Sequence, residues 1–313
     1  MTRPAILIHG PTASGKTELS IQLAQDLCGE IVNADAMQVY RDLRIITARP
    51  SDEDMARAPH HLFGVVDGAI RYSTGEWRHD VAARIQDIQR RGRVPIVIGG
   101  TGLYLSALTE GLSDMPDIPD DARGEAWKLV DASTDAAHDK LAQIDPSTAQ
   151  RLKPGDGQRI ARALEVWFAT GQPISAFQTP KPPDLRADEW IGVALTPRRS
   201  DLYQRIDARF EAMVESGALE EVRALYERRL DPSLPIMKAH GVPGFQAYFD
   251  GLASLETAIS RAQRDTRRYA KRQFTWIANQ FPHWARIPSE DLETRVGVVS
   301  ALFAEIDAAM MKR

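Results

Sequence analysis

The sequence GPTASGKT at residues 10–17 decides the fold of this chain. It satisfies the pattern G-x-x-x-x-G-K-[ST] in full. An apolar run at 4–9 precedes it, and Leu19, Leu23 and Leu27 follow with the spacing of a helix. This order of strand, loop and helix is what a phosphate-binding loop needs, because glycines let backbone N–H groups turn toward phosphate oxygens at a helix N-terminus. A chance match in an ordinary turn is disfavoured by this context.

The motif predicts a site for a di- or triphosphate group without showing whether the ligand is ATP or another phosphorylated compound. Lys16 would supply a positive charge, and Thr17 would be a metal ligand for Mg²⁺. The residues of the predicted loop are Gly10, Pro11, Thr12, Ala13, Ser14, Gly15, Lys16 and Thr17.

Further strands and helices alternate along the chain. The sequence predicts strands at 30–34, 94–98 and 190–195, and a helix at 75–91 with one charged and one apolar face. This alternation predicts an α/β fold, a P-loop NTPase-like parallel sheet flanked by helices. Because ligands gather beyond the carboxyl ends of parallel strands, the loops at 10–17, 35–38 and 99–102 should converge on one site.

A helical insertion is expected in the middle of the chain. From residue 114 the sequence becomes rich in proline and aspartate, and a second proline-rich linker lies at 179–183. We therefore expect a core domain at 1–113 and 190–313 and a helical insertion domain at 114–189. Within the core, further helices are predicted at 202–216, 219–229 and 255–279.

Three polar side chains follow the predicted strands. Asp35 would accept a proton from an attacking nucleophile, or else would cap a helix N-terminus; spacing alone leaves both open. Gln38 carries the donors and acceptors that suit the edge of a base. Thr101, within Gly99-Gly100-Thr101-Gly102, would donate a hydrogen bond to a phosphate oxygen. His60 and His61 have no evident third partner for a metal, so a structural role is favoured.

Composition excludes several classes of protein. Hydrophobic residues make up 43% of the chain and no stretch approaches the ~18 consecutive apolar residues of a membrane span. The net charge of −4 argues against indiscriminate coating of nucleic acid. The one cysteine, Cys28, excludes an internal disulfide and a Cys-based zinc site, and is expected to be a small buried residue on the first helix. The apolar segment before residue 10 leads straight into the loop, so it is not expected to be a cleaved signal, and a cytoplasmic location is predicted.

One helix is strongly basic. On the helix at 257–277, four arginines fall within a narrow arc, and apolar and aromatic residues gather on the flank beside it. A solvated helix face and a contact to RNA phosphate or to a diphosphate are both compatible with this pattern. The four residues are Arg261, Arg264, Arg268 and Arg272.

Taken together, the motifs resemble those of a known enzyme family. The segments are GPTASGKT (10–17), ADAMQVY (34–40), ITARPS (46–51), PHHL (59–62), IGGTGLYL (98–105), DPSTAQRLKPGDGQRIARALEVWFATGQPIS (145–175), RIDARFEAMVESGALEEVRALY (205–226) and YAKRQFTW (269–276). In this order, along essentially the whole chain, they resemble bacterial tRNA dimethylallyltransferases, also called tRNA isopentenyltransferases.

The resemblance implies a reaction and its partners. It implies transfer of a dimethylallyl group from dimethylallyl diphosphate to N6 of the adenosine 3′-adjacent to the anticodon, in tRNAs that read codons beginning with U. The loop at 10–17 would then hold the donor diphosphate rather than ATP, with Mg²⁺ near Thr17 as cofactor. The tRNA would bind through its anticodon stem-loop, and a monomer without a membrane partner is expected.

The resemblance also assigns roles to residues. Asp35, as general base, Thr101 and Lys16 would be catalytic. The insertion would contact the anticodon stem-loop, and Arg205, Arg209 and Arg272 would contact diphosphate or RNA, with surface helix charges as the alternative for Arg205 and Arg209. The residues expected to bind tRNA are Asp35, Ala36, Met37, Gln38, Thr101, Arg123, Gln158, Arg159, Ile160, Ala161 and Arg162.

Three other functions are also compatible with a P-loop and an acidic residue after the second strand. A P-loop small-molecule kinase would use Asp35 to deprotonate a hydroxyl group with ATP as donor. An adenylate prenyltransferase would modify free AMP or ADP. A P-loop ATPase module would bind RNA without modifying it. The helical insertion with Arg159 and Arg162 favours a tRNA substrate, since a free nucleotide needs no separate RNA-binding domain.

Overall fold

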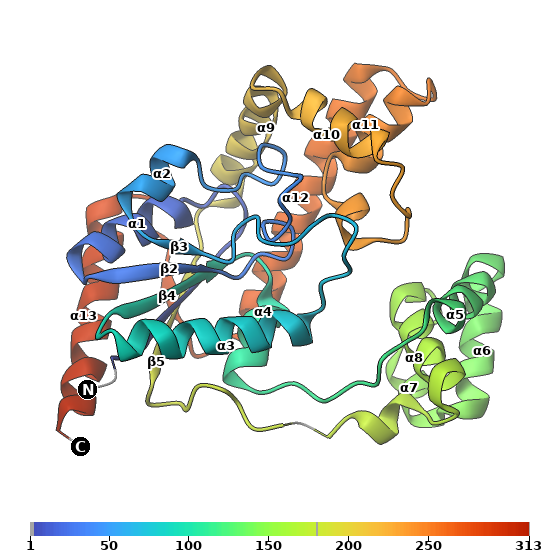
Figure 1. The fold of residues 1–313 in the computed structure, drawn as a ribbon, viewed down its shortest axis with the longest axis horizontal. Coiled ribbons are helices and arrows are strands. Elements are labelled where there is room, and N and C mark those ends of the chain that lie inside the picture. The colour runs from blue at the N-terminus through green and yellow to red at the C-terminus, as the bar shows by residue number, and fades with distance from the viewer. Residues whose placement is uncertain (1–2, 180, 313) are drawn as a thin grey trace. The chain divides into compact units, whose positions relative to one another are not determined.

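A six-stranded parallel sheet lies at the centre of the fold (Figure 1). The computed structural model describes residues 3–179 and 181–312. The strand order is β3-β2-β4-β1-β5-β6, and every pairing is parallel. The strands are β1 (Ala5–His9), β2 (Gly29–Asn33), β3 (His60–His61), β4 (Val94–Gly99), β5 (Trp190–Leu195) and β6 (Ala285–Ile287). The described residues thus have the α/β fold with a parallel sheet that the sequence predicts.

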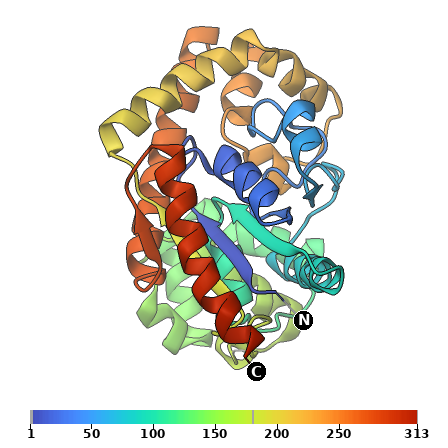
Figure 2. The ribbon, with the colours of Figure 1, turned by 90° about the vertical axis from the view of Figure 1, so that its left-hand side faces the viewer.

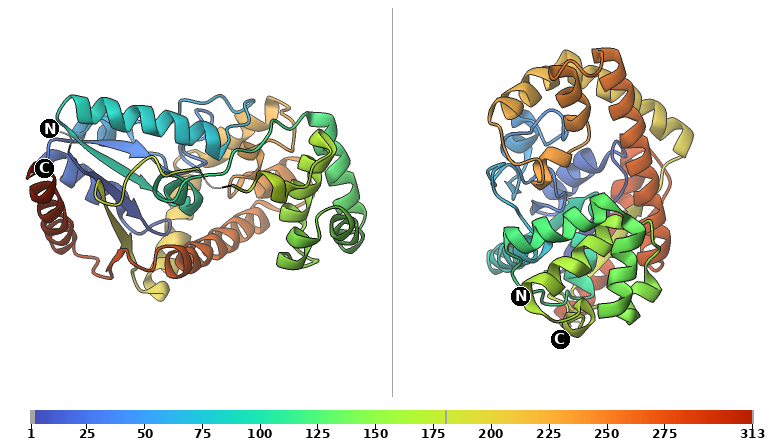
Figure 3. Two further views of the ribbon diagram at one scale, coloured as in Figure 1. Left: turned by 90° about the horizontal axis from the view of Figure 1, so that it is seen from below. Right: turned by 90° about the vertical axis from the view of Figure 1, so that its right-hand side faces the viewer.

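Helices cover both faces of the sheet because its central strands alternate between two apolar cores. Ile6 and Ile8 of β1 face a core shared with α1 (Lys16–Asp26) and α13 (Leu292–Met311). Leu7 faces the opposite core, shared with α3 (Thr74–Arg90) and α4 (Gly102–Thr109). Figure 2 shows α13 running along one face, and Figure 3 shows the sheet between α3 and α13. All five residues of β1 are buried, as expected of a strand covered on both sides.

The register brings three strand ends to one edge of the sheet. His9 lies opposite Gly99, and Asn33 lies opposite Ile98. The loops that follow β1, β2 and β4 therefore begin side by side at the carboxyl edge. This arrangement confirms the parallel sheet that the sequence predicts and explains how segments far apart in the chain form one site.

A layer of four helices follows β5 in the chain. The helices α9 to α12 pack on one another, and the last of them carries the arginines noted in the sequence. The remaining elements are short: α2 (Asp52–Arg57) and η2 (Pro235–Lys238). The layer consists of α9 (Arg199–Glu215), α10 (Ala218–Glu227), α11 (Val242–Phe249) and α12 (Leu255–Gln280).

Glu110–Pro183 forms a compact unit of its own, separate from the segments before and after it. The sequence places its limits at 114 and 189. It contains α5 (Asp120–Ala132), α6 (Thr134–Ile144), α7 (Pro146–Arg151), α8 (Gly157–Thr170) and η1 (Ile174–Phe177). Buried residues such as Ala126, Leu141 and Leu164 form its core. Ser133, Asp145 and Asp156 cap successive helices through their side chains, which explains where each helix begins.

Three features differ from the sequence-based expectation. The strands β3 and β6 contain two and three residues, too few to show a pattern. The helix α13 was not named among the predicted helices. The prediction for Cys28 is wrong: it is exposed, beyond the end of α1, with φ 52°. Among the described residues, no helix combines the length and the apolar character needed to cross a membrane.

Candidate functional site

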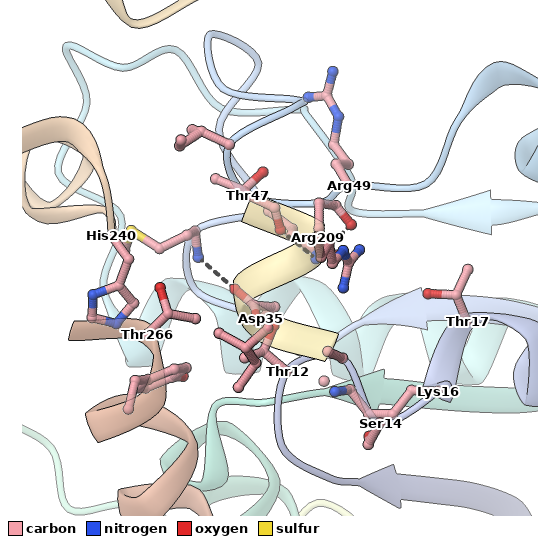
Figure 4. A pocket seen from close by; sticks show the side chains of 18 of the residues that line it. Thr12, Ser14, Lys16, Thr17, Asp35, Thr47, Arg49, Arg209, His240 and Thr266 are labelled. Carbon is pink, nitrogen blue, oxygen red and sulfur yellow. Dashed lines mark hydrogen bonds between the residues drawn. The ribbon is translucent and has the colours of Figure 1, made fainter. Parts of the chain in front are cut away.

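A cavity of about 910 Å³ lies at the carboxyl edge of the sheet (Figure 4). The loops after β1, β2 and β4 form one part of its wall, and α9, α12 and residues 238–240 form the rest. Lys16, Asp35 and Thr101, the three residues expected to be catalytic, all line it. The structure therefore brings together the three loops that the sequence predicts to converge.

The loop at 10–17 is held in place by the C-terminal helix. Two of its residues have positive φ, Ala13 at 61° and Gly15 at 84°. Arg295 of α13 is buried and donates a hydrogen bond of 2.9 Å from Nη1 to the Ser14 carbonyl, and a second from Nε to the Ser289 carbonyl. The positive φ favours glycine at position 15, and a Cβ there would lie 2.6 Å from Arg295 Nη1, so a larger residue would displace this arginine from the loop.

Lys16 begins helix α1 and faces the cavity. Its Nζ donates hydrogen bonds of 2.9 Å to the carbonyls of Gly10 and Pro11. Burial lowers the pKa of the Lys16 ammonium to about 8; the Asp35 carboxylate opposes this shift, and the Arg209 guanidinium adds to it. Lys16 is therefore largely charged at pH 7 but loses its charge within two pH units above that.

Arg209 and Arg205 of α9 have different surroundings. The Arg209 side chain is exposed toward the cavity, and within the described residues it makes no hydrogen bond or ion pair. Although the residue is exposed to the cavity, the protein atoms around it displace part of the water from the Arg209 guanidinium and lower its pKa. Arg205, one turn earlier, forms an ion pair with Glu290. Arg209 is thus the cation of this pair that an anionic ligand in the cavity would meet.

Asp35 is fixed by a turn rather than by a helix. Asn33 holds the backbone on both sides, accepting from the Asp35 N–H at 2.8 Å and donating to the Asp35 carbonyl at 3.0 Å. One oxygen of Asp35 accepts from the Met37 N–H at 2.9 Å. No helix begins here, so the helix N-cap interpretation of Asp35 is wrong. The second carboxylate oxygen lies above Gly100, 3.4 Å from the position of a Cβ there.

Thr101 links two of the loops. Its hydroxyl accepts a hydrogen bond of 3.0 Å from the Ala36 N–H, and its own N–H donates to the Ala34 carbonyl. A Cβ at Gly99 would lie only 1.9 Å from the Ala34 carbonyl oxygen. The glycine is therefore required for the close approach of the two strand ends, which puts the Thr101 hydroxyl beside the turn that carries Asp35.

Gln38 joins this turn to the next loop. Its side-chain nitrogen donates to the carbonyls of Thr47 and Ala48, at 2.9 and 3.1 Å. Glu221 of α10 holds the same loop from the other side, because its carboxylate accepts from three consecutive backbone N–H groups at 44–46. Residues 46–51 thereby form a fixed part of the cavity wall.

Gln273 of α12 is a site residue that sequence reasoning missed. It is buried, its Oε1 accepts from the Thr12 N–H at 3.0 Å, and its Nε2 donates to the Gly100 carbonyl at 2.8 Å. Tyr269, one turn earlier, donates to the same carbonyl at 3.2 Å. A glutamine on the otherwise apolar flank of this helix was the available signal, because a buried amide needs polar partners.

His9 lies buried directly before the loop. Neither ring nitrogen has a hydrogen-bond partner in the described part of the chain. Burial, with the nearby charge of Lys16, lowers the pKa of His9 to about 3. His9 is therefore neutral at physiological pH and adds no charge to the site. The other histidines noted in the sequence have local partners: His60 contacts the Ala58 carbonyl and His61 the Glu30 carboxylate.

The residues expected to bind RNA in the insertion all belong to the unit Glu110–Pro183. Arg123 and Arg162 both contact Glu165, at 3.6 and 3.2 Å. Gln158 and Arg159 are exposed, whereas Ile160 and Ala161 are buried in the core of this unit. Only the polar members of the set therefore present side chains at the surface.

The fold and the sequence motif together define a P-loop protein of the α/β class, in which the loop at 10–17 and the carboxylate of Asp35 line one cavity. Comparison with known proteins gives the family. The chain belongs to the IPP transferase family, whose model matches residues 38–280, while a model described as isopentenyl transferase matches residues 4–62.

Individual relatives are similar to this chain over nearly its whole length. A tRNA dimethylallyltransferase from Hyphomonas neptunium is 54% identical, with 98% of each chain covered. The solved structure of a tRNA isopentenylpyrophosphate transferase from Bacillus halodurans has a TM-score of 0.72 and is 33% identical, covering 99% of this chain and 98% of the other. A eukaryotic dimethylallyltransferase acting on tRNA has a TM-score of 0.75 at 31% identity, covering 93% of this chain and 75% of the other.

Proposed function

We propose that this protein transfers a dimethylallyl group from dimethylallyl diphosphate to N6 of the adenosine 3′-adjacent to the anticodon, in tRNAs that read codons beginning with U, and releases diphosphate. One observation carries the proposal: Lys16 and Arg209, two cations suited to a diphosphate, share a single cavity with the carboxylate of Asp35. The names of the relatives support the dimethylallyl group and the tRNA.

The loop at 10–17 would hold the leaving group. In the allylic donor the C–O bond breaks readily once the charge that develops on the diphosphate is stabilised. Backbone N–H groups at the start of α1, the Lys16 ammonium and the Arg209 guanidinium would supply this stabilisation. Because these groups are already in place, little reorganisation is needed during the reaction.

The donor set fits a magnesium ion that is bound mainly by its ligand. The Thr17 hydroxyl lines the cavity, and within residues 3–179 and 181–312 no group of three or more His, Cys, Asp or Glu side chains gathers to hold a metal. Mg²⁺ is commonly held by one or two protein groups together with phosphate oxygens. When bound, it would neutralise charge on the diphosphate.

Asp35 would take the proton from N6. As the new C–N bond forms, the amine becomes acidic, and a carboxylate within hydrogen-bond reach accepts the proton. The turn that fixes Asp35 leaves one of its oxygens over Gly100, beside Thr101. Thr101 would orient the amine, and the side-chain oxygen Oε1 of Gln38 would accept a hydrogen bond from the base, since its Nε2 is bonded to the loop at 47–48. The adenosine must leave its stack in the anticodon loop to reach this cavity.

The insertion would bind the anticodon stem-loop. Arg123, Gln158, Arg159 and Arg162 are the polar residues of this unit that we assign to RNA contacts. An adenylate prenyltransferase or a small-molecule kinase would have no use for such a unit. A cytoplasmic location and a monomeric state stay predictions.

A single assay separates these functions. The protein is mixed with Mg²⁺ and dimethylallyl diphosphate, together with an unmodified anticodon stem-loop RNA, with AMP, or with neither. Prenylated adenosine is expected only in the RNA, and mass spectrometry of the digested RNA locates it. Product on AMP but not on RNA would refute the proposal, and ATP turnover without prenyl transfer would favour a kinase or an ATPase.

A further inference from the structure

The segment 43–49, which we call the 43–49 loop, is held together by its own hydrogen bonds. The Ala48 N–H donates to the Ile45 carbonyl at 2.9 Å, and the Thr47 hydroxyl donates to the Leu43 carbonyl at 2.7 Å. Ala48 has φ 56°, a left-handed conformation that a residue with a side chain keeps only when its surroundings hold it. The loop therefore behaves as one piece, and a group that fixes one end of it also fixes the other.

Glu221 of α10 attaches the 43–49 loop to the hydrophobic core. Its carboxylate accepts hydrogen bonds of 2.5 to 2.9 Å from the backbone N–H groups of residues 44, 45 and 46. Bonds to an ionised acceptor are stronger than those between neutral groups. The helix itself is anchored by Ala218, Val222 and Leu225, which are buried. Glu221 is not among the described residues that line the cavity, so it can affect a bound ligand only through the loop that it holds.

The other end of the loop fixes the side-chain amide of Gln38. The nitrogen Nε2 donates to the carbonyls of Thr47 and Ala48, at 2.9 and 3.1 Å, and all three residues line the cavity. A planar amide carries its donors on the nitrogen and its acceptor on the oxygen. Because the loop holds Nε2, the oxygen Oε1 is the end that can bond a base in the cavity. The amide cannot turn by 180° without losing both bonds to the loop.

A fixed acceptor distinguishes an amino base from an oxo base. Adenine presents the donors of its N6 amino group, whereas a 6-oxopurine presents an oxygen that only accepts. Oε1 of Gln38 would accept from the amino group and repel the oxygen. An amide that could turn would offer Nε2 to the oxygen and would tolerate either base. Discrimination between the two bases therefore depends on whatever keeps the Gln38 amide from turning.

We propose that Glu221 is a positioning residue for recognition of the target base. By holding the 43–49 loop, it keeps Oε1 of Gln38, rather than Nε2, directed at the base. This inference rests on the proposed function, since it takes adenosine in RNA as the substrate. It makes the selection of an amino base depend on a carboxylate outside the cavity. The alternative, that Glu221 only stabilises the fold, is an outcome of the tests below.

The first test measures the preference for adenosine over inosine in RNA binding. Stem-loop RNAs carry one or the other at the target position, and their dissociation constants are measured without donor. Wild type is expected to prefer adenosine, and Glu221→Gln should lose roughly five- to tenfold of this preference, the value of about one hydrogen bond. Its affinity for dimethylallyl diphosphate should match that of wild type, because the loop at 10–17 is not changed.

Two further variants control this comparison. Glu220→Gln changes an exposed neighbour in the same helix and should behave as wild type in every measurement. Glu221→Asp keeps the charge on a shorter side chain, so its preference for adenosine should lie between those of wild type and Glu221→Gln. If Glu221→Gln does not fold, Glu221→Asp carries the test.

The second test asks whether Glu221 acts through Gln38. Gln38→Met removes the amide and should remove the same preference, and adding Glu221→Gln to it should cause no further loss. Without any RNA, the Nε2 protons of Gln38 can be followed by NMR in protein labelled with ¹⁵N-glutamine. They should exchange with water about tenfold faster in Glu221→Gln than in wild type, because the loop opens more often.

The outcomes separate this inference from the proposed function. A wild type without preference for adenosine, additive losses in the double variant, or an unchanged preference in Glu221→Gln would each overturn the inference, as would an equal loss of donor affinity. If the wild type fails to prenylate RNA but loses its preference for adenosine in Glu221→Gln, the proposed function fails and the positioning role stands. If the wild type prenylates RNA and Glu221→Gln is only less stable in urea, the positioning role alone fails.

Discussion

Raising the pH from 7 to 9 is expected to weaken binding of dimethylallyl diphosphate about tenfold, because Lys16 loses its charge over this interval. With a pKa of about 8, the Lys16 ammonium is charged in about 90% of molecules at pH 7 and in about 10% at pH 9. A bound diphosphate places negative charge beside the ammonium and raises its pKa, so the complex stays protonated. Affinity therefore falls with the charged fraction of the ligand-free protein.

Other titrating groups do not mimic this effect. The last ionisation of a phosphate lies near pH 6, so the donor is almost fully ionised throughout the range. His9, with its pKa lowered to about 3 by burial, stays neutral. Burial raises the pKa of the Tyr269 hydroxyl, which keeps it neutral as well. Lys16 is therefore the group in this part of the cavity that we expect to titrate between pH 7 and 9.

Calorimetric titration of the donor with Mg²⁺ and without RNA measures this dependence. Wild type is compared with Lys16→Met, which should bind more weakly at pH 7 and show little change up to pH 9. At pH 8.5 the heat should also vary with the ionisation enthalpy of the buffer, since binding takes up a proton. Equal wild-type affinity at pH 7 and pH 9, or the same tenfold loss in Lys16→Met, would refute the reasoning.

Three further predictions concern single residues. Asp35→Asn should lower the single-turnover rate by a factor of about 10² to 10⁴ with little loss of RNA affinity, and a large loss of RNA binding would make Asp35 a recognition residue instead. Asp54→Asn, which changes another acid of the same cavity, should leave the rate nearly unchanged. Gln273→Leu should weaken donor binding about tenfold through loss of two buried hydrogen bonds, and unchanged donor affinity in calorimetry would contradict this. Glu221→Ala should lower the free energy of unfolding in urea by about 1 to 3 kcal/mol, because three backbone N–H groups lose their acceptor, while Glu220→Ala should have little effect.

The sheet could be predicted from sequence wherever a strand is long and buried. The strands β1, β2, β4 and β5 contain five or six residues each and read as apolar runs bounded by polar or glycine residues. The edge strands β3 and β6 form only because a longer neighbour offers them backbone partners, which no local pattern records. The helix α13 also depends on context, because its buried face is defined by the sheet and α1.

The residues of the candidate site also differ in whether the local sequence identifies them. Lys16, Asp35 and Thr101 were found because each lies in a short local motif at a strand end. For Arg209 and Arg205 the sequence left two alternatives open, and the difference between them depends on Glu290, far along the chain. Gln273 could not be assigned, since its partners are 261 and 173 residues away.

The bond between Arg295 and the Ser14 carbonyl joins residues 281 positions apart, and this separation has a consequence for how the protein is made. At about 5 to 20 residues per second, a ribosome needs roughly 14 to 56 seconds to go from one to the other. Throughout that time the nascent loop has its complete motif but lacks the buried arginine that holds it. A chain released before α13 is synthesised would therefore contain every residue of the phosphate-binding motif and still bind its donor poorly.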